Sequence, residues 1–120
     1  TLKIKVKNNT NIVKVIKDKK NFVLYLSRGN VPFEFKKRVN SYNKHLSIVS
    51  FRPESLEKFA LSSKTPLEKI EDIELLRALE IGLKIKSLNL NGDSFSVDVP
   101  EDFERANTVM AKDKFFKLYK

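Results

Sequence analysis

Three glutamates recur at three-residue steps in the middle of the chain: Glu68, Glu71 and Glu74. Residues three apart lie on one face of a helix, so these carboxylates would form an acidic row. One interpretation is a solvated face that pairs with lysines. The other directs Glu74 toward a pocket and leaves Glu68 and Glu71 as scaffold or interface groups.

Asp98 is the most suggestive acid outside this row. It follows a short apolar stretch, 95–97, and precedes a helix that opens at Pro100. A carboxylate at such a strand end can hold Mg²⁺, with the remaining positions left to water and phosphate oxygens. The alternative is a helix cap, in which Asp98 accepts hydrogen bonds from free N–H groups of the first turn.

Arg28 and His45 complete the set of candidate ligand-binding residues. Arg28 ends a predicted strand, where its planar fork can clamp a carboxylate; the alternative is a surface arginine. His45 begins an apolar stretch and can bond a ligand hydroxyl or carboxylate, or serve as a hydrogen-bonded structural histidine.

The elements that must position these residues follow from periodicity. Helices are predicted over 53–61, 66–81 and 100–110 and strands over 2–7, 12–16, 22–26, 45–51, 83–90 and 95–97. Thr65 and Pro66 suit a helix start, Gly82 suits its end, and Ile70, Ile73 and Leu76 belong to the face expected to anchor it. The polar turn 17–21 makes 12–26 a hairpin, and 31–42 reads as an exposed loop. The tail, 115–119, is expected to pack against the body.

This mixed order favours an α/β fold in a single domain over residues 1–120. The 120 residues carry 24 Lys and Arg against 15 Asp and Glu, a net charge of +9. That balance favours polyanionic partners such as nucleotide phosphates, an acidic sugar or nucleic acid. Cysteine is absent and histidine occurs once, which excludes disulfides and a histidine-rich zinc site within this chain. No glycine-rich phosphate loop, nucleic-acid motif, signal peptide or membrane-length apolar run is present.

Several blocks, in order, resemble the second half of the 3-deoxy-manno-octulosonate (Kdo) cytidylyltransferases, the CMP-Kdo synthetases. The resemblance runs from about residue 10 to the C-terminus. It is carried by Val13–Ile16, Leu24–Arg28, Lys44–Ile48, Pro66–Ile85 and Val97–Asp102.

The resemblance implies a cytoplasmic, homodimeric nucleotidyltransferase that converts CTP and Kdo to CMP-Kdo and pyrophosphate with Mg²⁺, for lipopolysaccharide biosynthesis. It implies a mixed, mostly parallel sheet flanked by helices, as in nucleotide-diphospho-sugar transferases, with a protruding β-hairpin. Arg28, His45 and Glu74 match substrate-binding positions on the sugar side. Asp98 matches a catalytic, metal-binding aspartate. No membrane partner is implied, and nucleic acid is disfavoured.

The chain departs from the family pattern at a few positions. Leu75 replaces a glutamine, Val49 an aromatic residue, Ser96 a glycine and Val99 a threonine. The family's N-terminal half, with its CTP loop and first metal-binding aspartate, has no counterpart here, so the isolated chain is expected to be inactive. Two alternatives stay open: a cytidylyltransferase for another 2-keto acid sugar, nonulosonic or amino-Kdo, and a non-catalytic basic domain that binds nucleic acid.

Overall fold

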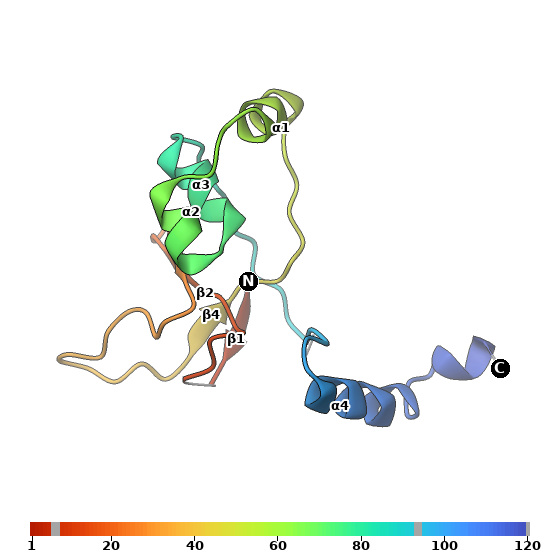
Figure 1. The fold of residues 1–120 in the computed structure, drawn as a ribbon. Helices are drawn as coiled ribbons and strands as arrows, with labels where there is room; N and C mark the ends of the chain where they lie inside the picture. Colours follow the sequence, from red (N-terminus) through yellow and green to blue (C-terminus); the bar gives the residue numbers. More distant parts are fainter. Residues whose placement is uncertain (6–7, 93–94, 120) are drawn as a thin grey trace.

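The computed structural model describes residues 1–5, 8–92 and 95–119, which form a small sheet with helices beside it (Figure 1). The strands are β1 (Leu2–Ile4), β2 (Lys14–Lys17), β3 (Val23–Ser27) and β4 (Tyr42–Lys44). The helices are α1 (Pro53–Ala60), α2 (Pro66–Glu71), α3 (Glu74–Glu80), α4 (Pro100–Met110) and a 3₁₀ helix (Phe116–Tyr119). Of the predicted first strand, Leu2–Ile4 is confirmed, while positions 6 and 7 lie outside the described residues.

The sheet has the order β1-β4-β2-β3, and each described pair of strands is antiparallel. The prediction of a mostly parallel sheet is therefore wrong for the described residues. A parallel pair needs a crossover of a dozen or more residues, whereas β2 and β3 are joined by a short turn. Asp18 closes that turn, since its Oδ1 accepts hydrogen bonds from the backbone N–H of Lys20 and of Phe22, both at 2.8 Å.

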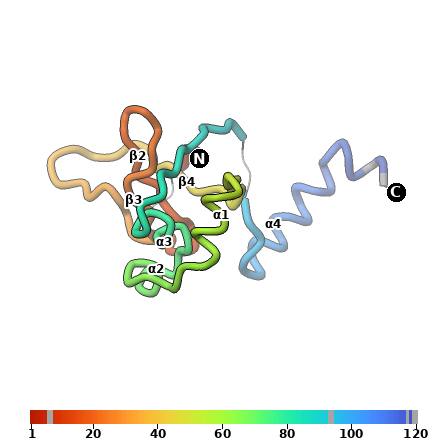
Figure 2. The backbone as a smooth tube through the Cα atoms, turned by 90° about the horizontal axis from the view of Figure 1, so that it is seen from above, coloured from red at the N-terminus to blue at the C-terminus, as the bar shows by residue number. Residues whose placement is uncertain are grey.

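The hairpin β2–β3 is confirmed, but it does not protrude. Its apolar side chains, Val15, Val23 and Leu26, are buried against α3. The loop between β3 and β4 is the segment that extends away from the sheet (Figure 2). The exposed loop predicted over 31–42 is confirmed up to the start of β4. Tyr42, the last residue of that predicted loop, is instead the first residue of β4, which pairs with β1 and β2.

Three other predicted strands have a different structure. Residues 45–51 follow β4 but contain no strand, and neither do residues 95–97. Within 83–90, Lys86 alone bridges to Phe22, supported by hydrogen bonds from Val23 N–H to Ile85 and from Ser87 N–H to Asn21. This segment therefore runs along the free edge of β3 without forming a regular ladder.

The helix predicted over 66–81 is two helices. Asp72 adopts a left-handed conformation (φ 51°, ψ 49°) and Ile73 is extended, which ends α2 and starts α3 in a new direction. Aspartate tolerates the left-handed region better than most residues. Pro66 opens α2 and Gly82, with φ of 83°, follows α3 as predicted, although Thr65 makes no side-chain capping bond.

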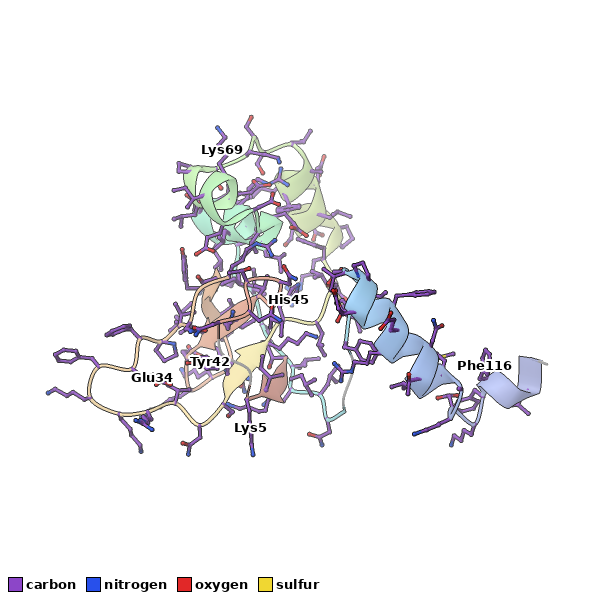
Figure 3. The ribbon with its side chains drawn as sticks, turned by 60° about the horizontal axis from the view of Figure 1, so that its bottom comes forward. Lys5, Glu34, Tyr42, His45, Lys69 and Phe116 are labelled. Carbon is purple, nitrogen blue, oxygen red and sulfur yellow. The ribbon has the colours of Figure 1, made fainter. Side chains whose placement is uncertain are left out.

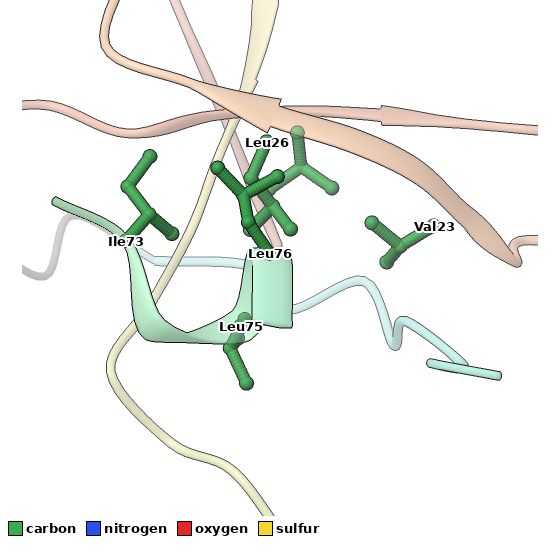
Figure 4. Close-up of a cluster of buried hydrophobic side chains, with 6 residues drawn as sticks. Val23, Leu26, Ile73, Leu75 and Leu76 are labelled. Carbon is green, nitrogen blue, oxygen red and sulfur yellow. The ribbon is translucent and has the colours of Figure 1, made fainter. Parts of the chain in front are cut away.

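The core lies between the hairpin β2–β3 and α3 (Figure 4). Leu76 is 0% exposed and Leu26 is 1% exposed. The cluster contains Val15, Val23, Leu26, Ile73, Leu75 and Leu76.

The helices α1 and α4 start at prolines, and both confirm the predictions for their segments. Helix α4 and the C-terminal end lie away from α1–α3 (Figures 1 and 2). Phe115 and Leu118 are 58% and 75% exposed, so the prediction that the tail packs against the body is wrong. None of the described helices is both long and apolar enough to cross a membrane.

The break at Asp72 separates two isoleucines that the sequence pattern treats alike. Ile73 is 4% exposed, whereas Ile70 is 79% exposed, which corrects its prediction as an anchor. We expect Ile73→Ala to lower the free energy of unfolding by about 2–5 kcal/mol, because it leaves a cavity. Ile70→Ala, the matched control, should change it by about 0.5 kcal/mol or less. Urea denaturation measures the free energy of unfolding of both variants. An equal decrease in the two would contradict the helix break at Asp72.

Candidate functional site

A cavity of about 400 Å³ opens where the turn before β2, the chain after β4 and the start of α3 meet. Its lining includes all four predicted site residues: Arg28, His45, Glu74 and Asp98. These positions span 70 residues of sequence, so the fold rather than local spacing brings them together. Figure 3 shows His45 at the junction between the sheet and the helices.

His45 is held by the sheet that precedes it. Its backbone N–H donates to the carbonyl of Val13 at 2.9 Å, which continues the pairing of β4 with β2. Burial lowers the pKa of His45 below its ordinary value of 6.5; Glu74 opposes this shift, and the amino terminus adds to it. A neutral imidazole has one N–H donor and one acceptor nitrogen, so His45 can bond a hydroxyl in either sense.

Glu74 stands at the first position of α3, just after the break. Its carboxylate is exposed and close enough to influence the titration of His45. Its apolar neighbours Ile73 and Leu75 are 4% and 6% exposed and anchor the helix. The site therefore has an acid that faces the cavity while the residues on either side fix its backbone.

Glu68 and Glu71 do not form a solvated row with Glu74. Glu68 is 4% exposed and pairs with Arg77, whose Nε lies 3.1 Å from Glu68 Oε2. Glu71 accepts hydrogen bonds from Ser27 Oγ at 2.7 Å and from Arg28 N–H at 2.9 Å. Both therefore make internal contacts, and the solvated-face interpretation is wrong for them.

Arg28 is half-buried and firmly bound by backbone carbonyls. Nε donates to Glu71 at 2.8 Å, Nη1 to Thr10 at 3.1 Å and Nη2 to Asp72 at 3.1 Å. It is thus no loose surface arginine. A guanidinium has five N–H donors, so these three bonds leave one on Nη1 and one on Nη2.

Asp98 is exposed at the edge of the cavity, and it does not cap α4. The N-cap position is Val99, without a side-chain capping bond, while the backbone N–H of Asp98 donates to Asp102 Oδ2 at 3.3 Å. The capping alternative is therefore wrong.

The surroundings of Asp98 fit a single Mg²⁺ ligand. The described residues contain no group of three or more His, Cys, Asp or Glu that could hold a metal. Mg²⁺ commonly keeps several waters and binds through one or two carboxylates plus substrate phosphates. An exposed carboxylate that lines a cavity suits this role, with the other ligands supplied from outside this cluster.

Other cavity residues carried little signal in the sequence. Asn11, Ser47 and Ser96 contribute small polar groups to the wall, and Lys44 contributes a cation. Lys44 precedes His45 and Ser47 follows it by two residues, and this proximity to His45 is the one sequence signal that indicates them. Val49, placed where the resemblance expects an aromatic residue, also lines the cavity.

The chain is similar to known cytidylyltransferases in sequence and in fold. A family model described as cytidylyltransferase matches residues 4–85. The chain is 41% identical over 104 residues to the 3-deoxy-manno-octulosonate cytidylyltransferase of Thermodesulfovibrio yellowstonii, covering 82% of this chain and 41% of the relative. It is 38% identical over 110 residues to the protein of that name from Fusobacterium nucleatum, covering 88% of this chain and 45% of the relative.

The mitochondrial protein of that name from Arabidopsis thaliana is 35% identical over 103 residues, across 83% of this chain and 36% of the relative. A solved structure of CMP:2-keto-3-deoxy-manno-octonic acid synthetase complexed with CTP is similar in fold, with a TM-score of 0.81 and 25% identity. It covers 93% of this chain and 48% of that one. The chain spans less than half the length of these relatives.

The lowered pKa of His45 makes a prediction about stability. Between the folded pKa and about 6.5 the unfolded chain binds more protons than the folded one, so the free energy of unfolding falls as pH falls through that window. His45→Gln removes this contribution. We expect its free energy of unfolding, measured by urea denaturation, to depend less on pH between pH 7 and 5 than that of wild type. Glu74→Gln should lower the pKa of His45 further, measured by NMR titration. Identical slopes for wild type and His45→Gln would contradict the burial argument.

Proposed function

Because this chain belongs to the cytidylyltransferase family, we propose that it is the sugar-binding portion of a Kdo cytidylyltransferase. The reaction is CTP plus Kdo to CMP-Kdo and pyrophosphate, in which the anomeric hydroxyl of the sugar attacks the α-phosphorus. The observation that carries the proposal is the cavity that gathers Arg28, His45, Glu74 and Asp98. A guanidinium, a neutral imidazole and two carboxylates suit the binding of an acidic, hydroxyl-rich sugar beside a phosphate group.

Each residue has a role that its surroundings support. Arg28 holds the sugar carboxylate with the two N–H groups that its backbone contacts leave over. His45, neutral at pH 7, and Glu74 bond sugar hydroxyls and fix the orientation of the ring. Such positioning accelerates a transfer by placing the nucleophile and the phosphorus in reacting geometry.

Asp98 would contribute one carboxylate ligand to Mg²⁺. When bound, the metal neutralises negative charge on the phosphates. The exposure of Asp98 at the cavity edge leaves its carboxylate accessible to a hydrated cation and to a nucleotide.

The nucleotide side of the reaction belongs to the part of the relatives that this chain does not match. The described cavity contains no glycine-rich phosphate loop, and glycine occurs only three times in 120 residues. We expect the 120 residues alone to release no pyrophosphate. A cytoplasmic homodimer is proposed for the longer protein, and the exposed apolar residues Phe103, Val109 and Met110 of α4 support such an interface.

A different 2-keto acid sugar is the second candidate. Val49 and Leu75 present apolar groups at the cavity wall where the resemblance predicts an aromatic ring and an amide. Fewer hydrogen-bonding partners favour a sugar with a hydroxyl replaced or masked, such as a nonulosonic acid or an amino-Kdo.

The assay is pyrophosphate release by the longer polypeptide that contains this chain, with CTP, Mg²⁺ and either Kdo or those alternative sugars. Release that requires both CTP and Kdo is the expected result. Release with another sugar alone would select the second candidate, and no release with any sugar would contradict the proposal.

Asp98→Asn should lower turnover on the order of 100-fold, because a neutral amide binds Mg²⁺ poorly. Its melting temperature should match that of wild type, because Asp98 caps nothing. The exposed residue Glu104 of α4 supplies the control, Glu104→Gln, which should retain both turnover and Mg²⁺ dependence. A variant that melts early with an unchanged Mg²⁺ dependence would contradict the metal role.

A further inference from the structure

We infer that Glu71 is a positioning residue: its carboxylate fixes the backbone at Ser27 and Arg28, which places the Arg28 guanidinium at the cavity and thereby sets the affinity for the sugar acid. The identity of the ligand in this inference rests on the proposed function. The positioning of Arg28 by Glu71 rests on hydrogen bonds within the chain. The sequence pattern assigns Glu71 only a scaffold or interface role.

The carboxylate of Glu71 joins α2 to the end of β3. Oε1 accepts from Ser27 Oγ at 2.7 Å, and Oε2 accepts from the backbone N–H of Arg28 at 2.9 Å. Ser27 is 4% exposed, so this bond is shielded from water. Both oxygens of one carboxylate therefore fix two consecutive residues of the strand end.

The Arg28 side chain in turn binds the C-terminal end of α2. Nε donates to the carbonyl of Glu71 and Nη2 to that of Asp72. The last carbonyls of a helix lack intrahelical partners and attract cations, so Arg28 satisfies them. The two residues thus hold each other through one hydrogen bond in each direction, between the side chain of one and the backbone of the other.

Lys14 supplies the electrostatic reason for a carboxylate at this position. It is 1% exposed, and its Nζ donates to the carbonyl of Arg28 at 2.7 Å. Burial lowers the pKa of Lys14, Glu71 raises it and Arg28 lowers it. Glu71 is therefore a negative charge that favours the charged form of Lys14 against burial and the nearby Arg28.

Removal of that charge leaves Lys14 and Arg28 to repel each other in a poorly solvated place. Lys14 is enclosed, whereas Arg28 is half-buried and borders the cavity. Arg28 is consequently the group that moves. Its displacement changes the direction of the two N–H groups that its backbone contacts leave over.

The test is a double-mutant cycle in the longer polypeptide, with Glu71→Gln, Arg28→Lys and the double variant. We expect Glu71→Gln to raise the KM for the sugar about 10-fold, the loss of roughly one charge-assisted hydrogen bond, and to leave the KM for CTP within about 2-fold. Arg28→Lys should have a similar effect, and the double variant should be no worse than either single one. Additive effects, or an unchanged sugar KM in Glu71→Gln, would overturn the inference.

Glu68→Gln is the matched control. Glu68 is a buried carboxylate on the same helix, but its partner is Arg77 and it does not line the cavity. This variant should lower the melting temperature and leave the KM for the sugar unchanged. A rise equal to that of Glu71→Gln would assign both effects to general loosening of α2 and overturn the inference.

A crystal structure of Glu71→Gln gives a readout that is independent of activity. The inference predicts that the Arg28 guanidinium leaves the carbonyls of residues 71 and 72. A guanidinium that keeps both bonds would overturn it. Wild-type protein that is inactive with every sugar contradicts the proposed function alone, and the position of Arg28 then decides the inference.

Discussion

The packing of α3 against the hairpin β2–β3 is the constraint on which the rest of the structure depends. Leu76 and Leu26 are almost wholly buried at its centre, and Ile73 extends the contact to the break before α3. Burial of apolar surface is the largest favourable term in folding. Because the sheet has only four short strands, this contact supplies most of the interior of the described residues and fixes where α3 begins.

The candidate site follows from the same constraint. Ile73 and Leu75 are nearly buried and anchor the start of α3, while Glu74 between them is exposed and lines the cavity. The strand end that carries Arg28 is tied to α2 by Glu71, and His45 is tied to β2 through Val13. The polar groups of the site therefore stand on backbone segments that the core and a few internal hydrogen bonds have already fixed.

The sequence predicted those features whose cause is local. Proline at the first turn marked three helices, Gly82 marked a helix end, and two short apolar stretches around a polar turn marked the hairpin. It did not predict the antiparallel pairing of β4 or the irregular path of 45–51, because pairing depends on partners distant in sequence. Residue type and position made the four site residues candidates and the resemblance implied their roles, whereas the cavity that joins them depends on tertiary contacts.

The acidic row shows why periodicity alone misassigned this region. Glu68, Glu71 and Glu74 have identical spacing, yet one pairs with Arg77, one binds the end of β3 and one faces the cavity. The apolar residues follow a helical period throughout 66–81, so the local sequence does not predict the left-handed conformation of Asp72. Arg28, more than 40 residues earlier, bonds the carbonyls on that turn and stabilises it. The break, and with it the separate role of each glutamate, is a property of the assembled fold.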